Sequence, residues 1–118
     1  MGDSFKDLLV WQRAVQMTTA IYKLTAGFPT SEQFGLTNQL RRAAVSVASN
    51  IAEGYGRSTT GEYLQFLGMA RGSNCEVQTQ LVISSELHFG NQESRASANH
   101  LSEEVSRMLV AMMKKLRE

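Results

Sequence analysis

The stretch from residue 60 to residue 89, TGEYLQFLGMARGSNCEVQTQLVISSELHF, decides the fold, because its apolar side chains recur at helical spacing over 30 residues without a proline. At 1.5 Å per residue it predicts a helix about 45 Å long. Three apolar faces run along it: Tyr63, Phe66, Leu67, Ala70, Val77 and Leu81; then Leu64, Cys75, Val82 and Phe89; then Met69, Ile83 and Leu87. A helix that is apolar nearly all round is expected to be buried nearly all round.

The remaining glycines and the single proline divide the rest of the chain into three further helices, which we expect at residues 5–26, 35–53 and 92–117. Ser4 and Asp7 resemble a capping box for the first, and Gly54 is expected to end the second. The last has one apolar face opposite a charged one, so it needs one partner surface. These features predict an all-α fold, an antiparallel up-down four-helix bundle formed by residues 1–118 as a single domain.

Composition narrows the classes of function. The chain has 118 residues, of which 42% are hydrophobic and 19% charged, and its formal net charge is +1. That charge does not by itself indicate nucleic acid, a membrane or an acidic substrate. The longest apolar runs are too short for a membrane span, and the first residues lack the pattern of a signal peptide. We therefore expect a cytoplasmic protein with no membrane contact.

Metal and cofactor chemistry lacks its usual residues. Cys75 is the only cysteine, and with His88 and His100 it makes an incomplete set for a zinc site. Di-metal bundles use Glu-x-x-His pairs, and the sequence has none. The Gly54-x-Gly56 pair follows a helix and lacks the lysine of a phosphate-binding loop. We expect no cofactor and interpret Cys75 as a small packing residue.

The surplus of apolar surface predicts self-association. Each helix of a bundle turns about one stripe to the centre, whereas the helices at 5–26 and 60–89 carry more, and monomers seldom expose large apolar patches. We expect an oligomer whose interface includes Leu64, Val82, Met69 and Leu87. The alternative is that the long helix is central and loops shelter its additional faces.

A polar stripe along the second helix, formed by Arg42, Ser46, Asn50 and Glu53, adds a second candidate site. One interpretation is a small ligand-binding bundle or hydrolase in which Glu53 or Glu76 acts as a general acid or base. The other is a structural network of Asn50, Glu53, Arg71 and Glu76. We favour the network, because no nucleophile stands near a histidine base. Asn74 lies on the main apolar face and must therefore be hydrogen-bonded.

Three arginines form a candidate basic cluster, namely Arg41, Arg42 and Arg57. Arginines bind phosphates with release of counterions, and a symmetric oligomer would repeat the cluster around its axis. Nucleic acid is therefore a possible class of partner.

Several segments together resemble one family, the four-helix-bundle proteins encoded by intervening sequences in bacterial large-subunit ribosomal RNA genes. The segments are Phe5-x-Asp7-Leu8-x-Val10-Trp11-Gln12, Phe34-Gly35-Leu36-Thr37-x-Gln39-Leu40-Arg41-Arg42-Ala43-Ala44, Ser49-Asn50-Ile51-Ala52-Glu53-Gly54 and Ala70-Arg71-Gly72-Ser73. The resemblance implies a homopentamer without enzymatic activity or a cofactor. Similarity to accessory proteins of diversity-generating retroelements implies association with nucleic acid or a reverse transcriptase, with Arg41 and Arg42 as contacts. It also implies the structural role of Asn50, Glu53, Arg71 and Glu76.

Overall fold

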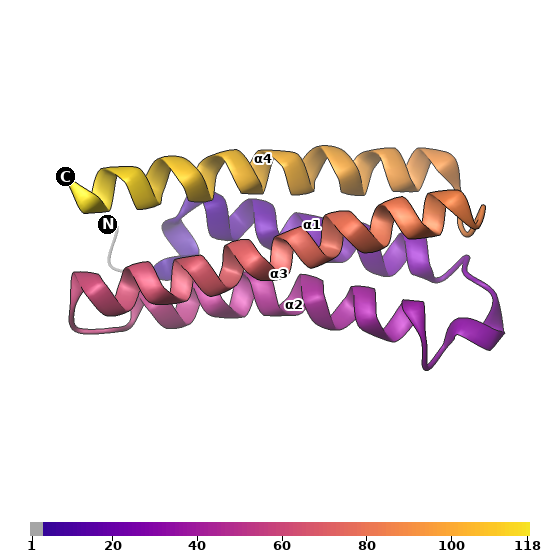
Figure 1. Cartoon of the computed structure of the whole chain (residues 1–118), viewed down its shortest axis with the longest axis horizontal. Coiled ribbons are helices and arrows are strands. Elements are labelled where there is room, and N and C mark those ends of the chain that lie inside the picture. The colour runs from indigo at the N-terminus through magenta and orange to yellow at the C-terminus, as the bar shows by residue number, and fades with distance from the viewer. Residues whose placement is uncertain (1–3) are drawn as a thin grey trace.

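Four antiparallel helices make up the computed structural model, which describes residues 4–118, and they confirm the all-α four-helix bundle (Figure 1). They are α1 (Leu9–Thr25), α2 (Leu36–Tyr55), α3 (Thr60–Glu86) and α4 (Gln92–Arg117), with short 3-10 turns η1 (Phe5–Asp7) and η2 (Thr30–Glu32). Short connections join consecutive helices, as the up-down topology requires.

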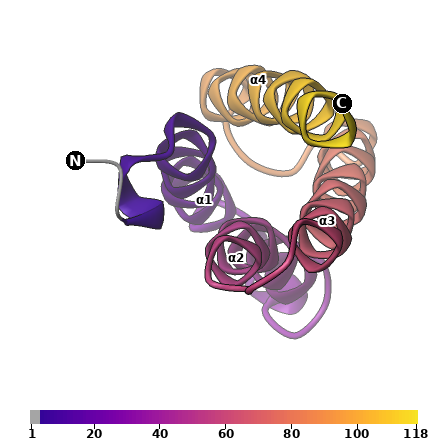
Figure 2. The same ribbon diagram turned by 90° about the vertical axis from the view of Figure 1, so that its left-hand side faces the viewer.

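The helices form a closed square when viewed along the bundle, in the order α1, α2, α3, α4 and back to α1 (Figure 2). Each helix packs against its two neighbours, and within residues 4–118 the diagonal pairs make no close backbone approach. The bundle measures 44 × 23 × 23 Å. In this part of the chain, no helix combines the length and the apolar character needed to cross a membrane.

The core lies along the axis of this square. On α3 the buried positions alternate in steps of three and four residues: Leu67, Ala70, Asn74, Val77, Leu81 and Ser84. This spacing keeps one stripe facing the neighbouring helices. Asn74 is the large polar side chain in that stripe, and its Nδ2 donates to the carbonyl of Ser102 at 2.8 Å while the Ser102 hydroxyl donates to its Oδ1 at 2.9 Å. The expectation that Asn74 is hydrogen-bonded is confirmed.

The first helix starts later than expected. Ser4 caps the 3-10 turn η1, where its hydroxyl accepts from the backbone N–H of Lys6, and not the α-helix. The backbone is extended at Leu8, and α1 begins at Leu9. This break lets the ring of Phe5 fold back edge-on against Trp11, with 5.3 Å between the ring centroids. A contact between two aromatic rings thus stabilises a turn in place of the expected first helical turn.

Gly54, at the corner between α2 and α3, does not end the second helix as expected. Helix α2 continues through this residue to Tyr55, and Gly54 is buried. A Cβ atom at this position would lie 2.8 Å from the Cβ of Phe66 on α3, which is closer than packing allows. Gly54 is therefore a point of close helix approach and not a stop signal. Beside it, Tyr63 packs edge-on against Tyr55, and burial and this neighbour both raise the pKa of Tyr63.

Helix α3 ends at Glu86, three residues before the expected end at Phe89. His88 adopts a left-handed backbone with φ of 59°, and the N–H groups of His88 and Phe89 donate to the carbonyls of Ser85 and Ser84. This arrangement is a Schellman motif, in which glycine is the usual left-handed residue. The turn places Phe89 against Phe28 with 5.7 Å between the ring centroids, which closes this end of the bundle.

Candidate functional site

Arg41 lies on α2 and is held against α1. Its Nε donates to the Thr25 hydroxyl at 2.8 Å, one terminal nitrogen donates to the carbonyl of Tyr22 at 3.4 Å, and the guanidinium stacks over the Tyr22 ring at 4.4 Å. These contacts occupy part of its hydrogen-bonding capacity and fix its orientation. Arg41 therefore helps to join α1 to α2, which leaves fewer of its donors for an external phosphate.

Arg57 is also held within the chain. It donates to a carboxylate oxygen of Glu53 at 2.8 Å and lies over the ring of Phe66 at 4.6 Å. Arg57 follows Arg41 by 16 residues, which corresponds to about 24 Å along a helix. The structure thus does not bring the three arginines of the expected cluster together, because Arg57 lies just beyond the C-terminal end of α2 and Arg41 and Arg42 lie in its first turns.

Arg42 differs from both, because its side chain is exposed and forms no hydrogen bond or ion pair within residues 4–118. It borders a hollow of about 330 Å³ between α2 and α3, together with Gln39, Ser46, Glu76 and Gln80. It also borders a second hollow of about 460 Å³ between α1 and α2, which Tyr22 and Val45 line. Arg42 is the member of the expected cluster whose guanidinium is available to a partner.

The four residues of the expected polar network do not bond to one another. Asn50 donates to the Ser46 carbonyl at 2.9 Å and to the Ser46 hydroxyl at 3.0 Å, and that hydroxyl lies 2.9 Å from the hydroxyl of Ser73 on α3. Glu53 pairs with Arg57, whereas Arg71 and Glu76 are exposed. The polar connection between α2 and α3 in this region is therefore the row Asn50, Ser46 and Ser73.

Glu53 and Glu76 do not form a common acid–base site. Glu76 borders the hollow that Arg42 also lines, and Glu53 follows Arg42 by 11 residues, or about 16 Å of helix. Both carboxylates are exposed. Within residues 4–118 there is no group of three His, Cys, Asp or Glu side chains placed to hold a metal ion. Cys75 is exposed, which corrects its interpretation as a packing residue.

The outward side of α3 carries exposed apolar side chains. Met69, Ile83 and Leu87 are 48%, 42% and 52% exposed, and spacings of fourteen and four residues place them on one side of the helix. We call this set the α3 outer face. Beside it Gly72, Cys75, Thr79 and Ile83 line a hollow of about 420 Å³ with Gln39, Glu76 and Gln80.

The expected interface residues divide among three environments. Met69 and Leu87 belong to the α3 outer face, and Val82 is 61% exposed on the adjoining side toward α4. Leu64 is only partly exposed because it packs against the core. A substitution at Leu64 would therefore affect folding as well as any contact between subunits.

Two exposed features were not singled out as interface residues from the sequence. Tyr22 and Val45 line the hollow between α1 and α2, and Phe34 in the preceding connection is 87% exposed. Tyr22 lies in the first helix, whose surplus of apolar surface predicted association without an interface residue being assigned there, and Phe34 carried no signal beyond its place in a family motif. Helical periodicity detects an apolar stripe, but it does not show which part of the stripe the neighbouring helices cover.

Comparison with known proteins agrees with this architecture. A crystal structure of a protein of unknown function from the S23 ribosomal protein family of Bacteroides thetaiotaomicron superposes with a TM-score of 0.81 at 20% sequence identity, covering 90% of this chain and 96% of that one. This likeness concerns the fold. No curated protein sequence matches significantly. The family model described as 23S rRNA-intervening sequence protein matches residues 6–111. The chain therefore belongs to the 23S rRNA-intervening sequence protein family.

Proposed function

We propose that this chain is a non-enzymatic interaction module that assembles with further copies of itself through the α3 outer face. The observation that carries the proposal is the exposure of Met69, Ile83 and Leu87 on one side of the longest helix. Exposed large apolar side chains that share one side of a helix are candidates for an association site, although Glu76 lies on the same side between Met69 and Ile83. Burial of this face against a second copy would remove the exposed area from water.

The glycines of α3 support a close approach by another helix. Gly61, Gly68 and Gly72 follow one another at spacings of seven and four residues, so they lie along one side of α3 beside the outer face. A Cβ at Gly61 or Gly72 would meet nothing within 4 Å, and one at Gly68 would meet the Met113 side chain at 3.8 Å. Glycine inside a helix costs about 0.5–1 kcal/mol relative to alanine. Nothing within this chain comes close enough to Gly72 to require a glycine there. Close packing against a helix of another copy would explain why the position is a glycine despite its cost to helix stability.

The chain also offers a second apolar surface for the contact. Tyr22 and Val45 are 43% exposed and line the hollow between α1 and α2, which is separate from the α3 outer face. Contact between two different surfaces of identical subunits produces a ring when the rotation closes and a filament when it does not. The family resemblance implies a ring of five subunits.

A ring would repeat Arg42 around its axis, and this repetition supports nucleic acid as the partner of the assembly. When several arginines of an assembly contact phosphates, each contact adds to the affinity and to its dependence on salt concentration. Arg42 is the arginine of the expected cluster without an internal bond. A reverse transcriptase remains the partner class that the resemblance implies.

Light scattering coupled to size exclusion at micromolar concentration tests the proposed assembly. We expect a multiple of the 13.1 kDa chain mass, with about 65 kDa for five copies. Ile83→Glu should return the mass of one chain and keep the helical circular dichroism signal, because a charge in an apolar contact is costly and this site is exposed in the single chain.

Val110→Glu is the matched control, since Val110 on α4 is 43% exposed against 42% for Ile83. The assembly should tolerate this change. A wild-type mass of one chain would reject self-association. An intact Ile83→Glu assembly, or equal dissociation of both variants, would reject the α3 outer face as its site.

A further inference from the structure

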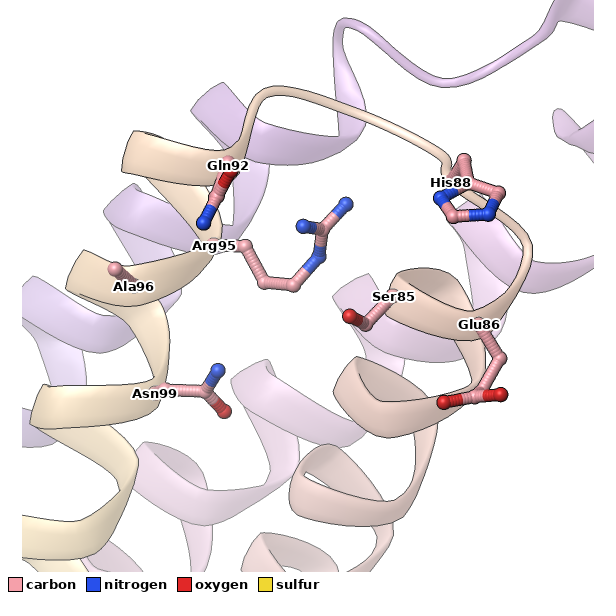
Figure 3. Close-up of a pocket in the computed structure, with 7 residues that line it drawn as sticks. All are labelled: Ser85, Glu86, His88, Gln92, Arg95, Ala96 and Asn99. Atoms are coloured by element: carbon pink, nitrogen blue, oxygen red, sulfur yellow. The ribbon is translucent and has the colours of Figure 1, made fainter.

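A pocket of about 530 Å³ lies between the end of α3 and the first turns of α4, away from the α2 arginines (Figure 3). Its volume falls within the range of small-molecule sites, about 300–1,000 Å³. Ser85 and Asn99 point into it from opposite walls, and the guanidinium of Arg95 occupies the space between the two helices. Gln92 and His88 also line it. One chain forms the whole pocket, so it does not depend on the proposed assembly.

Arg95 is unusual in this bundle because a permanently charged side chain is only 9% exposed. One terminal nitrogen donates to the carbonyls of Phe89 and Gly90. The Nε atom is shielded from solvent and has no hydrogen-bond partner. Within residues 4–118, the ion pairs join Arg13 to Glu104 and Arg57 to Glu53, and none involves Arg95.

A buried guanidinium without a counterion is an unfavourable arrangement. A charge that leaves water loses its solvation, and an opposite charge with good hydrogen-bond geometry is what offsets that loss in proteins. The two loop carbonyls contribute partial negative charge only. Arg95 also borders an open pocket whose walls carry a hydroxyl and two amides that can donate hydrogen bonds.

We propose that this pocket binds a small oxyanion, a carboxylate or a phosphate, with Arg95 as the charged anchor. The planar guanidinium suits either anion, since it presents several donors in a fixed arrangement. Ser85, Gln92 and Asn99 supply neutral donors around it, and the imidazole of His88 stands at the turn that ends α3. The same donor set recognises a free anion or the acidic group of a larger metabolite.

Glu86, an acidic residue on the pocket wall, provides a test that distinguishes an anion site from a cation site. Its side chain is exposed, and Figure 3 shows its carboxylate directed away from the guanidinium of Arg95. A fixed negative charge at the rim repels an entering anion, although solvent weakens this repulsion. Glu86→Gln should therefore strengthen anion binding severalfold, whereas a cation site would lose affinity through the same change.

Nuclear magnetic resonance of the arginine Nε–H signals tests the proposal on the intact chain at pH 7. Sodium phosphate and sodium acetate are titrated separately, with sodium chloride holding the ionic strength constant. We expect the Arg95 signal, identified by its loss in Arg95→Lys, to shift until it saturates in one or both titrations. The tighter of the two anions identifies the preferred group. Arg42→Gln, on the other side of the bundle, should leave the response unchanged.

Two further variants keep the test informative if Arg95→Lys folds poorly. Asn99→Ala should weaken binding about tenfold, as expected when one hydrogen bond to a charged partner is removed. His88→Gly relieves the left-handed backbone, so it should raise the melting temperature, and it should weaken anion binding because it removes the imidazole from the pocket lining. Absence of saturation with both anions, or an Asn99→Ala affinity equal to wild type for both, would overturn the proposal.

Discussion

Helices α3 and α4 have nearly the same length, 27 and 26 residues, and pack against each other, yet their outward sides differ. The outward side of α4 is charged, with Glu103, Arg107, Lys114 and Lys115 exposed and Val110 as its exposed large apolar side chain among the described residues. The outward side of α3 exposes Met69, Ile83 and Leu87. Two helices in similar positions thus differ in surface: the outward side of α4 is mostly charged, whereas that of α3 carries three exposed apolar side chains with Glu76 among them, the difference on which the proposed self-association rests.

The inward sides of the same helices share one polar pair, and its removal should have the largest effect on stability. Asn74→Ala leaves the Ser102 hydroxyl and carbonyl without their buried partner. We expect the free energy of unfolding to fall by about 1–3 kcal/mol, measured by urea denaturation. Asn38→Ala, at an exposed site on α2, is the control and should change it little. An equal loss in both variants would contradict the importance of the pair.

The next prediction concerns the salt dependence of nucleic-acid binding, which distinguishes an arginine that contacts a phosphate from one that is paired within the chain. If the assembly binds labelled RNA or DNA, Arg42→Gln should reduce the slope of log affinity against log salt by about 0.7–0.9 for each phosphate that the arginine neutralises. Arg57→Gln should leave the slope unchanged, because Arg57 is paired with Glu53. Fluorescence anisotropy between about 50 and 200 mM salt measures both. No binding at the lower salt by an assembled oligomer would favour a protein partner.

A substitution at Gly72 should act in opposite directions on the single chain and on the assembly. In the monomeric Ile83→Glu background, Gly72→Ala should raise the free energy of unfolding by about 0.5–1 kcal/mol, because alanine favours the helix. In the wild-type background it should weaken association, because the added methyl group obstructs a close neighbour. Ser97→Ala, exposed on α4, is the control and should leave association unchanged. Unaltered association of Gly72→Ala would exclude close approach at this glycine.

The smallest effect is expected for Glu53→Gln. The pair between Glu53 and Arg57 spans one helical turn and both side chains are substantially exposed, 55% and 40%. Exposed pairs of this kind contribute about 0.3–0.5 kcal/mol. Thermal unfolding should therefore shift only slightly, and Arg57→Gln should shift it to the same extent. A loss of several kcal/mol would instead show that Glu53 belongs to a buried network.

The sequence predicted the four helices and most of their inward faces, because periodicity reports which positions share a side of a helix. Asn74 could be placed in the core and its need for a partner stated, since its position fits the stripe of Leu67, Ala70 and Val77. The same geometry places Glu76 about 200° around the helix from Asn74, on the outward side. The expected network does not form because spacing within one helix does not show which polar side chains face the next helix: on α3 it is Ser73 that meets Ser46, whereas Glu76 points outward.

Other features depend on contacts between two elements and could not be predicted from the apolar periodicity of one helix. The role of Gly54 depends on the position of Phe66 across the α2–α3 contact. The burial of Arg95 depends on the turn at His88, which brings the carbonyls of Phe89 and Gly90 over its guanidinium. The pair of Glu53 and Arg57, in contrast, follows from an i, i+4 spacing that the sequence already contained.

The Asn74–Ser102 pair also has a consequence for the choice among alternative alignments of the helices. A core that repeats about every seven residues can in principle slide by one repeat and bury similar apolar layers again. Seven positions before Ser102 stands Arg95, and seven positions after it stands Leu109. A slid α4 would thus set the Asn74 amide against a long cation or against a side chain with no hydrogen-bonding atom. One buried amide and one hydroxyl therefore select a single longitudinal register for α4, and with it the alignment of every apolar layer above and below them.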